Sequence, residues 1–159
     1  MMSAKPLQIA PAAEATPDLL RLDLQLCFAL YASSNLMTRL YRTLLGPLGL
    51  TYPQYLAMMA LWETTPQTVG ALGKRLSLDS GTLTPLFKRL EKLGLVERRR
   101  DPDDERRVLI DLTEKGQALR EKAAGVPFQV LCQLPISTED AIELKARLTR
   151  LAEGLAAER

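Results

Sequence analysis

The chain has 159 residues, 47% of them hydrophobic, which suffices for one ordinary core but not for two comfortable domains. Its net charge is only +2, so any binding to a polyanion must depend on where the basic residues lie. The sequence contains no histidine and only two cysteines, Cys27 and Cys132, which argues against most hydrolases and excludes a zinc cluster. We therefore expect no metal and no cofactor.

The first 17 residues combine Lys5 with three prolines and several alanines and lack the apolar run of a secretory signal. We expect a flexible arm there and a single domain over residues 18–159. No apolar stretch approaches the roughly 20 residues that cross a bilayer, and the low cysteine content favours a reducing compartment. These features predict a cytoplasmic protein with no membrane contact.

Apolar residues recur at helical spacing in the first half of the chain. The four predicted helices are residues 18–45, 54–63, 68–76, and a last one from Asp79 or Ser80 to Gly94. Gly46-Pro47 ends the first helix, and Thr51 with Pro53 opens the second. The last two are short and closely connected, which is the helix-turn-helix pattern whose second helix enters the major groove. Pro85 predicts a local irregularity in that second helix.

The pattern changes after Gly94. Residues 95–98 and 108–112 read as two strands around a charged turn, which predicts a hairpin, or wing. Thr113 is expected to cap a helix to about Leu134, and Ser137 with Asp140 resembles a capping box that opens a last helix to about Ala157. The predicted fold is mainly α with a small β-hairpin wing.

Basic residues are concentrated between Lys88 and Arg100, where six of them stand against two acidic residues, a local net charge of +4. Short hydroxyls and cations of the second helix suit base edges and phosphates, and the candidates are Ser80, Thr82, Thr84, Lys88 and Arg89. In the wing, Arg106 and Arg107 can reach an adjacent minor groove, and Asp104 can orient Arg106. Because this charge coincides with a helix pair and a hairpin, DNA binding is favoured over an ordinary solvated surface.

Three stretches of this region resemble the recognition helix and wing of the MarR family of winged helix-turn-helix regulators. They are Leu78–Leu86 with Lys88–Glu91, Asp104–Arg107, and Leu112–Gly116. The resemblance extends over roughly residues 20–157. It implies a homodimer whose first and last helices, about 18–46 and 113–157, interleave. Two winged helix-turn-helix heads, about 51–112, would then read double-stranded operator DNA with pseudo-palindromic symmetry.

Cys27 lies between Leu26 and Phe28, a setting more typical of a buried small hydrophobe than of a reactive thiol. A thiol with the reference pKa near 8.5 is only about 3% thiolate at pH 7, and no cation lies close in sequence to favour that form. Tyrosine hydroxyls could donate hydrogen bonds to a thiolate. Tyr41 is roughly 21 Å from Cys27 along a straight helix, so such a contact would have to come from another subunit. By spacing alone, the tyrosines are better explained as core filling.

The chain also resembles the organic-hydroperoxide-resistance regulators within the MarR family. That resemblance implies that Cys27 is the redox-sensing cysteine, that Tyr41 and Tyr52 donate hydrogen bonds to its thiolate, and that Cys132 of the other subunit is the resolving cysteine. It implies a repressor: organic hydroperoxides oxidise Cys27, and an intersubunit disulfide to Cys132 releases the operator. The reaction is stoichiometric, so no enzyme is expected.

Three alternatives remain open on the sequence. A MarR-like repressor could answer to a small aromatic ligand, with Cys27 as structural filler. A thiol peroxidase could use Cys27 and Cys132, although it would leave the basic wing unexplained. A winged helix could also serve protein contacts alone, and Lys88 and Arg106 would then be dispensable.

Overall fold

The computed structural model describes residues 18–157, so the arm predicted for residues 1–17 lies outside the described part. The chain forms two compact units, Met1–Met37 and Thr38–Arg159. None of the helices within residues 18–157 combines the length and the apolar character that crossing a membrane requires.

Helix α1, Leu26–Leu45, is shorter than the predicted helix from Asp18. A 3₁₀ turn, Leu22–Leu24, precedes it, and the residues flanking that turn, Arg21 and Gln25, have extended backbones. The side chain of Asp18 accepts a hydrogen bond from the Leu20 N–H at 3.1 Å. This local turn satisfies a backbone donor outside a helix, which explains why the prediction was wrong over residues 18–25.

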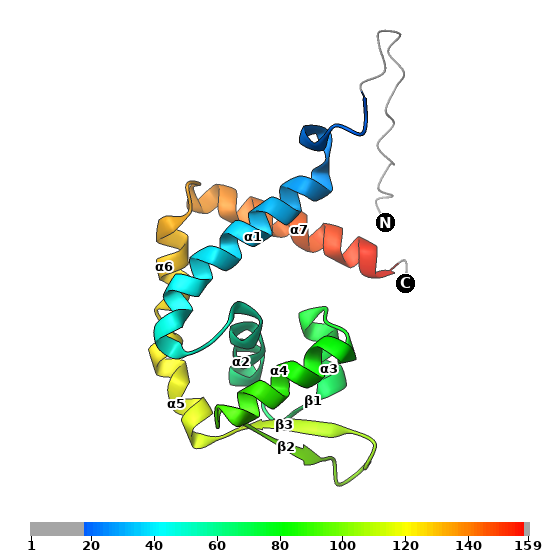
Figure 1. Ribbon diagram of the computed structural model, residues 1–159, viewed down its shortest axis with the longest axis vertical. Coiled ribbons are helices and arrows are strands. Elements are labelled where there is room, and N and C mark those ends of the chain that lie inside the picture. The colour runs from blue at the N-terminus through cyan, green and yellow to red at the C-terminus, as the bar shows by residue number, and fades with distance from the viewer. Residues whose placement is uncertain (1–17, 158–159) are drawn as a thin grey trace. The chain divides into compact units, whose positions relative to one another are not determined.

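The second unit contains the predicted helix-turn-helix and hairpin. Its elements in this part are η2 Gly46–Leu48, α2 Tyr52–Glu63, β1 Gln67–Thr68, α3 Val69–Leu76, α4 Ser80–Lys92, β2 Val96–Arg100 and β3 Val108–Leu112. Figure 1 shows α2, α3 and α4 gathered on one side of the strands, with the β2–β3 loop projecting away from the helices. The predicted fold, mainly α with a winged helix-turn-helix, is confirmed.

The helix ends follow from their capping residues. The Asp79 side chain accepts a hydrogen bond from the Thr82 N–H at 2.9 Å, and Thr51 donates its N–H to Gln54 Oε1 at 2.8 Å. Gly94 has φ of +71° and ends α4 with a left-handed turn. Helix α4 is unbroken through Pro85, so the predicted irregularity does not interrupt it.

The sheet has one strand more than predicted. Its order is β1-β3-β2, and both pairings are antiparallel. The hairpin of β2 and β3 is as expected, whereas β1 pairs Gln67 with Ile110 and Thr68 with Leu109. A strand of two residues is too short to show an alternating pattern, so only its partner strand defines it.

The core that supports the head lies between α2, α3, α4 and the sheet. Its members are fully or almost fully buried: Ala57, Met58, Leu61, Leu72, Phe87, Leu90, Val96 and Ile110. Helix α4 contributes Leu83, Leu86, Phe87 and Leu90 on one face, at the spacing of an amphipathic helix. Burial of that face leaves the opposite face of α4 directed to solvent.

The predicted single helix over residues 113–134 is wrong. The structure has two helices there, α5 Glu114–Ala123 and α6 Val126–Gln133. Pro127 has no N–H to donate to the carbonyl four residues earlier, and Gly125 beside it favours a break. Thr113 caps α5 by accepting from the Gly116 N–H at 3.0 Å, as predicted. Helix α7, Thr138–Ala157, is capped by Ser137, which accepts from the Asp140 N–H at 3.0 Å.

Gly116 lies against the backbone of Leu95, where a Cβ would be 2.0 Å from the Leu95 carbonyl oxygen. Backbone cannot yield as a flexible side chain can, so Gly116→Ala should lower the free energy of unfolding by about 2–3 kcal/mol. Urea denaturation measures the change. The control is Gly70→Ala in α3, where nothing lies within 4 Å of the added carbon. An equal effect of the two substitutions would contradict the role of this contact.

Candidate functional site

The exposed face of α4 carries every residue that the sequence predicted to read DNA from this helix. They are Ser80, Thr82, Thr84, Lys88 and Arg89, all exposed. The Asp79 cap fixes the start of the helix, and hydrogen bonds from the Thr82 backbone and hydroxyl hold the pKa of the Asp79 carboxyl below its usual value. The position and direction of this face are therefore set by the core beneath it and by the cap at its start.

Two of the hydroxyls on this face already use their protons within the helix. Thr82 Oγ1 donates to Asp79 Oδ2 at 3.1 Å, and Thr84 Oγ1 donates to the Ser80 carbonyl at 3.0 Å. Their oxygens remain able to accept hydrogen bonds. In this arrangement the two threonines suit donors such as the amino groups of bases better than phosphate oxygens, which only accept.

In the wing, Asp104 organises both arginines that the sequence singled out. Its carboxylate accepts from Arg106 Nε at 3.0 Å and from Arg106 Nη2 at 3.3 Å, and it lies 3.3 Å from Arg107 Nε. These contacts, first of all the hydrogen bond from the Arg106 side chain, lower the pKa of Asp104. The predicted orienting role of Asp104 thus has a geometric basis, and it extends to Arg107.

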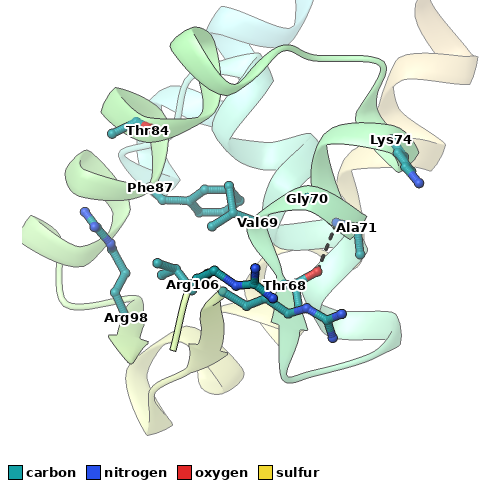
Figure 2. Close-up of a pocket in the computed structure, with 11 residues that line it drawn as sticks. Thr68, Val69, Gly70, Ala71, Lys74, Thr84, Phe87, Arg98 and Arg106 are labelled. Atoms are coloured by element: carbon teal, nitrogen blue, oxygen red, sulfur yellow. Dashed lines mark hydrogen bonds between the residues drawn. The ribbon is translucent and has the colours of Figure 1, made fainter. Parts of the chain in front are cut away.

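A groove of about 660 Å³ separates α3 and α4 from the wing. Apolar side chains and cations line it together: Thr68, Val69, Gly70, Ala71, Lys74, Thr84, Phe87, Arg98, Arg106, Arg107 and Val108. Figure 2 shows Phe87 and Val69 in the middle of the view, Arg98 on one side and Lys74 on the other. The groove brings α4 and wing residues, which the sequence assigned separately, to one concave surface.

Lys74 and Thr68 were not among the predicted site residues. Thr68 caps α3 by accepting from the Ala71 N–H at 3.1 Å, and Lys74 is exposed one and a half turns further along the helix. A helical projection of residues 68–76 would have placed Lys74 on the polar face, but only the fold shows that this face borders the wing.

Part of the local positive charge is balanced within the head. Arg98 lies 3.9 Å from Glu91, and Arg99 lies 3.5 Å from Asp111, whose Oδ1 also accepts from Thr65 Oγ1 at 2.8 Å. Glu91 is already included in the net charge of +4 counted over residues 88–100, whereas Asp111 lies outside that segment and lowers the charge of this surface further.

Both cysteines are free thiols and both are exposed. Cys27 is the second residue of α1, and Cys132 is the seventh residue of α6. The burial that the apolar neighbours of Cys27 suggested is absent in the single chain. Within residues 18–157, no cluster of three or more His, Cys, Asp or Glu side chains is placed to hold a metal ion.

The structure brings Tyr41 and Tyr52 together. Their rings stack with centroids 4.3 Å apart, and Tyr55, which the sequence analysis did not select, lies 6.0 Å from Tyr41. Burial raises the pKa of Tyr41 to about 12, and it also raises the pKa values of Tyr52 and Tyr55. A phenol is already protonated near neutral pH at its ordinary pKa of 10.0, and burial moves all three further from ionisation, so each can act as a hydrogen-bond donor.

The raised pKa of Tyr41 predicts a loss of stability in alkali. The unfolded phenol ionises near pH 10, whereas the folded one resists until about pH 12, so the stabilisation is present below pH 10 and disappears as the pH rises toward 12. Tyr41→Phe cannot ionise and should lose less free energy of unfolding between pH 9 and pH 11. Urea titrations at the two pH values measure this, with Tyr31→Phe, on a largely exposed ring, as control. Parallel losses in wild type and Tyr41→Phe would contradict the assignment.

Comparison with known proteins agrees with this geometry. Residues 39–123 match the family described as transcriptional regulator SarA/Rot. The chain is 51% identical over 138 residues to the organic hydroperoxide resistance transcriptional regulator of Bacillus subtilis, covering 87% of this chain and 94% of that one. Its fold is similar to two structures of AbfR, a protein known from Staphylococcus epidermidis.

The first of these is reduced AbfR bound to DNA, with a TM-score of 0.76 and 38% identity over 89% of this chain and 96% of AbfR. The second is disulfide-formed AbfR, with a TM-score of 0.58 and 39% identity over 86% of this chain and 90% of AbfR. These relatives are transcriptional regulators and not enzymes, which contradicts the thiol peroxidase alternative. By sequence and by fold, the chain belongs to the MarR family of winged helix-turn-helix transcriptional regulators, in the group of organic hydroperoxide resistance regulators.

Proposed function

We propose that this regulator is a homodimeric repressor that releases operator DNA when an organic hydroperoxide oxidises Cys27. The observation that carries the proposal is the stacked pair of Tyr41 and Tyr52, two phenols that remain protonated donors, in a chain with two free and exposed thiols. The DNA-binding part rests separately on the exposed face of α4 and the cation-lined groove beside it.

In the proposed complex, α4 lies in the major groove and the wing reaches an adjacent minor groove. Lys88, Arg89 and the three hydroxyls of α4 face the bases and nearby phosphates, while Asp104 holds Arg106 and Arg107 extended for the minor groove. The groove between them has the cations that a sugar–phosphate strand requires. The DNA-bound structure of reduced AbfR, which shares this fold, supports this reading.

Salt dependence tests the DNA interface. Lys74→Gln should reduce the slope of log K against log salt concentration by about 0.9, the release of one counterion. A mixed-sequence duplex is sufficient, because phosphate contacts do not depend on sequence. The control is Lys145→Gln, an exposed lysine of α7, which should leave the slope unchanged. Failure of the wild type to bind the duplex even at low salt would favour the alternative of a winged helix for protein contacts.

The homodimer is proposed because large apolar side chains are left uncovered in each unit. In the second unit these are Phe128, Leu131, Ile136, Ile142, Leu144, Leu148, Leu151 and Leu155, and α7 has no buried residue at all. In the first unit they are Leu19, Leu20, Leu22, Leu24, Leu26, Phe28, Tyr31 and Leu36. Apolar faces of this extent in a regulator are typical of an obligate dimer interface.

The proposed chemistry takes place at Cys27. The thiolate sulfur attacks the terminal oxygen of the hydroperoxide, the O–O bond breaks, and the alkoxide takes up a proton and leaves as an alcohol. Cys27 is oxidised to sulfenic acid and the peroxide is reduced. The thiolate of Cys132 from the other subunit then attacks this sulfur, the S–O bond breaks as the disulfide forms, and the departing hydroxide takes up a proton from the solvent to become water. Tyr41 and Tyr52 donate hydrogen bonds that favour the initial thiolate.

A disulfide between subunits must alter the spacing of the two α4 helices to release DNA. A hundredfold loss of operator affinity requires only about 2.7 kcal/mol of coupling. The disulfide-formed structure of AbfR supports the view that such a bond is compatible with this fold.

The redox proposal is tested with an operator selected from random duplexes. Reduced wild type, Cys27→Ser and Cys132→Ser should bind it equally well. After treatment with cumene hydroperoxide, the wild type should lose about a hundredfold in affinity and migrate as a covalent dimer on a non-reducing gel. Cys27→Ser should do neither, and Cys132→Ser should form no covalent dimer. Release by oxidised Cys27→Ser would contradict the sensing role.

A small aromatic ligand remains the second candidate, because a pocket of about 270 Å³ lies between α2, α5 and the start of α6. Tyr55, Met59 and Trp62 form its apolar wall, and Arg120 adds a cation. Operator binding that survives complete oxidation of Cys27 would favour this candidate over the thiol switch.

A further inference from the structure

We propose that Trp62 is a positioning residue that couples the tyrosine pair to the end of the recognition helix α4. This inference rests on the proposed redox function, since it concerns how a change near Tyr41 and Tyr52 reaches DNA. All of its contacts lie within the second unit.

Four aromatic rings form a continuous series through the head. Tyr52 stacks on Tyr41 with centroids 4.3 Å apart, Tyr41 lies 6.0 Å from Tyr55, and Tyr55 lies 6.2 Å from Trp62 in an edge-to-face arrangement. Three of these residues lie on α2 at positions 52, 55 and 62, which share one helix face. The series therefore runs along α2 from its first turn to its last.

The far end of the series is hydrogen-bonded to α5. Trp62 Nε1 donates to the Gly116 carbonyl at 2.9 Å, in the first turn of α5. Gly116 itself lies so close to the Leu95 carbonyl that a side chain has no room there. A shift of Trp62 would therefore displace the first turn of α5, which is packed directly against the backbone at the start of the wing.

The same turn of α5 holds the end of α4. Thr113 Oγ1 donates to the Gly94 carbonyl at 2.7 Å, and Lys115 Nζ donates to the Leu93 carbonyl at 2.7 Å. The Thr113 N–H donates to the Leu95 carbonyl at 3.2 Å. These three bonds join α5 to the residues that follow the recognition helix.

A displacement of the tyrosine pair can thus reach α4 through side chains and backbone groups that contact one another. Tyr55 is 2% exposed, and a close-packed interior transmits small displacements because its side chains have no empty space to move into. Packing alone does not prove coupling, so the test must measure an interaction between oxidation and DNA binding.

The test is Trp62→Phe, which keeps an aromatic ring and removes the N–H donor. The ratio of operator Kd in the oxidised and reduced states should fall about fivefold from the wild-type ratio, the equivalent of one hydrogen bond of about 1 kcal/mol. The rate at which cumene hydroperoxide consumes the Cys27 thiol should be unchanged. The matched control is Leu56→Met, a volume-conserving change on α2 that leaves the ring series intact, and it should keep the wild-type ratio.

Trp62 is the only tryptophan of the chain, so its fluorescence gives a readout that needs no substitution of Trp62 itself. Peroxide should shift its emission in the wild type and not in Cys27→Ser. Equal changes of both Kd values in Trp62→Phe, or an unchanged emission in wild type that releases DNA, would overturn the role of Trp62 alone. A wild type that keeps its DNA after complete oxidation would instead overturn the proposed function and this coupling together.

Discussion

The close contact between Gly116 and the Leu95 carbonyl is the constraint on which the head depends. It lets the first turn of α5 lie directly on the chain that links the recognition helix to the wing. At that distance Thr113 and Lys115 reach the carbonyls of Gly94 and Leu93, and Trp62 reaches the Gly116 carbonyl. A larger side chain at position 116 would separate these partners. The end of the recognition helix and the starts of the wing and of α5 consequently meet at one packed junction.

In the head, some charged residues hold the wing strands and loop in place, and other charged residues remain available to attract DNA. Arg98 and Arg99 are partly neutralised by Glu91 and Asp111, and they tie the wing strands to their neighbours. Asp104 restrains Arg106 and Arg107 and reduces the entropy that they would lose on binding DNA. Lys74, Lys88 and Arg89 have no ion pair among residues 18–157 and remain available to phosphates. A chain with a net charge of +2 can thus present a strongly basic face.

Local capping explains why so much of the fold was predictable from sequence. Asp79, Thr113 and Gly94 each end or begin a helix through contacts with residues a few positions away. The features that depend on residues distant in sequence were not predicted. Strand β1 is defined only by its pairing with β3. Tyr55 and Trp62 make their contacts only because α2 lies beside Tyr41 and Gly116. The selection of Tyr41 and Tyr52 as candidate partners of Cys27 came from the family resemblance, since spacing alone favoured core filling, and the stacking of their rings was not predicted. Gly125 and Pro127 are sequence signals of the break between α5 and α6, and the prediction of a single helix did not take them into account.

The choice of phenols as partners for the proposed sensing thiol has a chemical reason. The chain contains no histidine, and a phenol is a neutral donor that can favour a thiolate at Cys27 by hydrogen bonding. A strong cationic partner would lower the basicity of the sulfur further, and the nucleophilicity of a thiolate falls with its basicity. A phenol whose pKa is raised by burial cannot lose its proton to the thiolate or to the medium near neutral pH, so it keeps donating throughout that range. A phenol is protonated near neutral pH even at its reference pKa of about 10, so Tyr41 and Tyr52 can act there as neutral donors that lower the basicity of the thiolate less than a cation would.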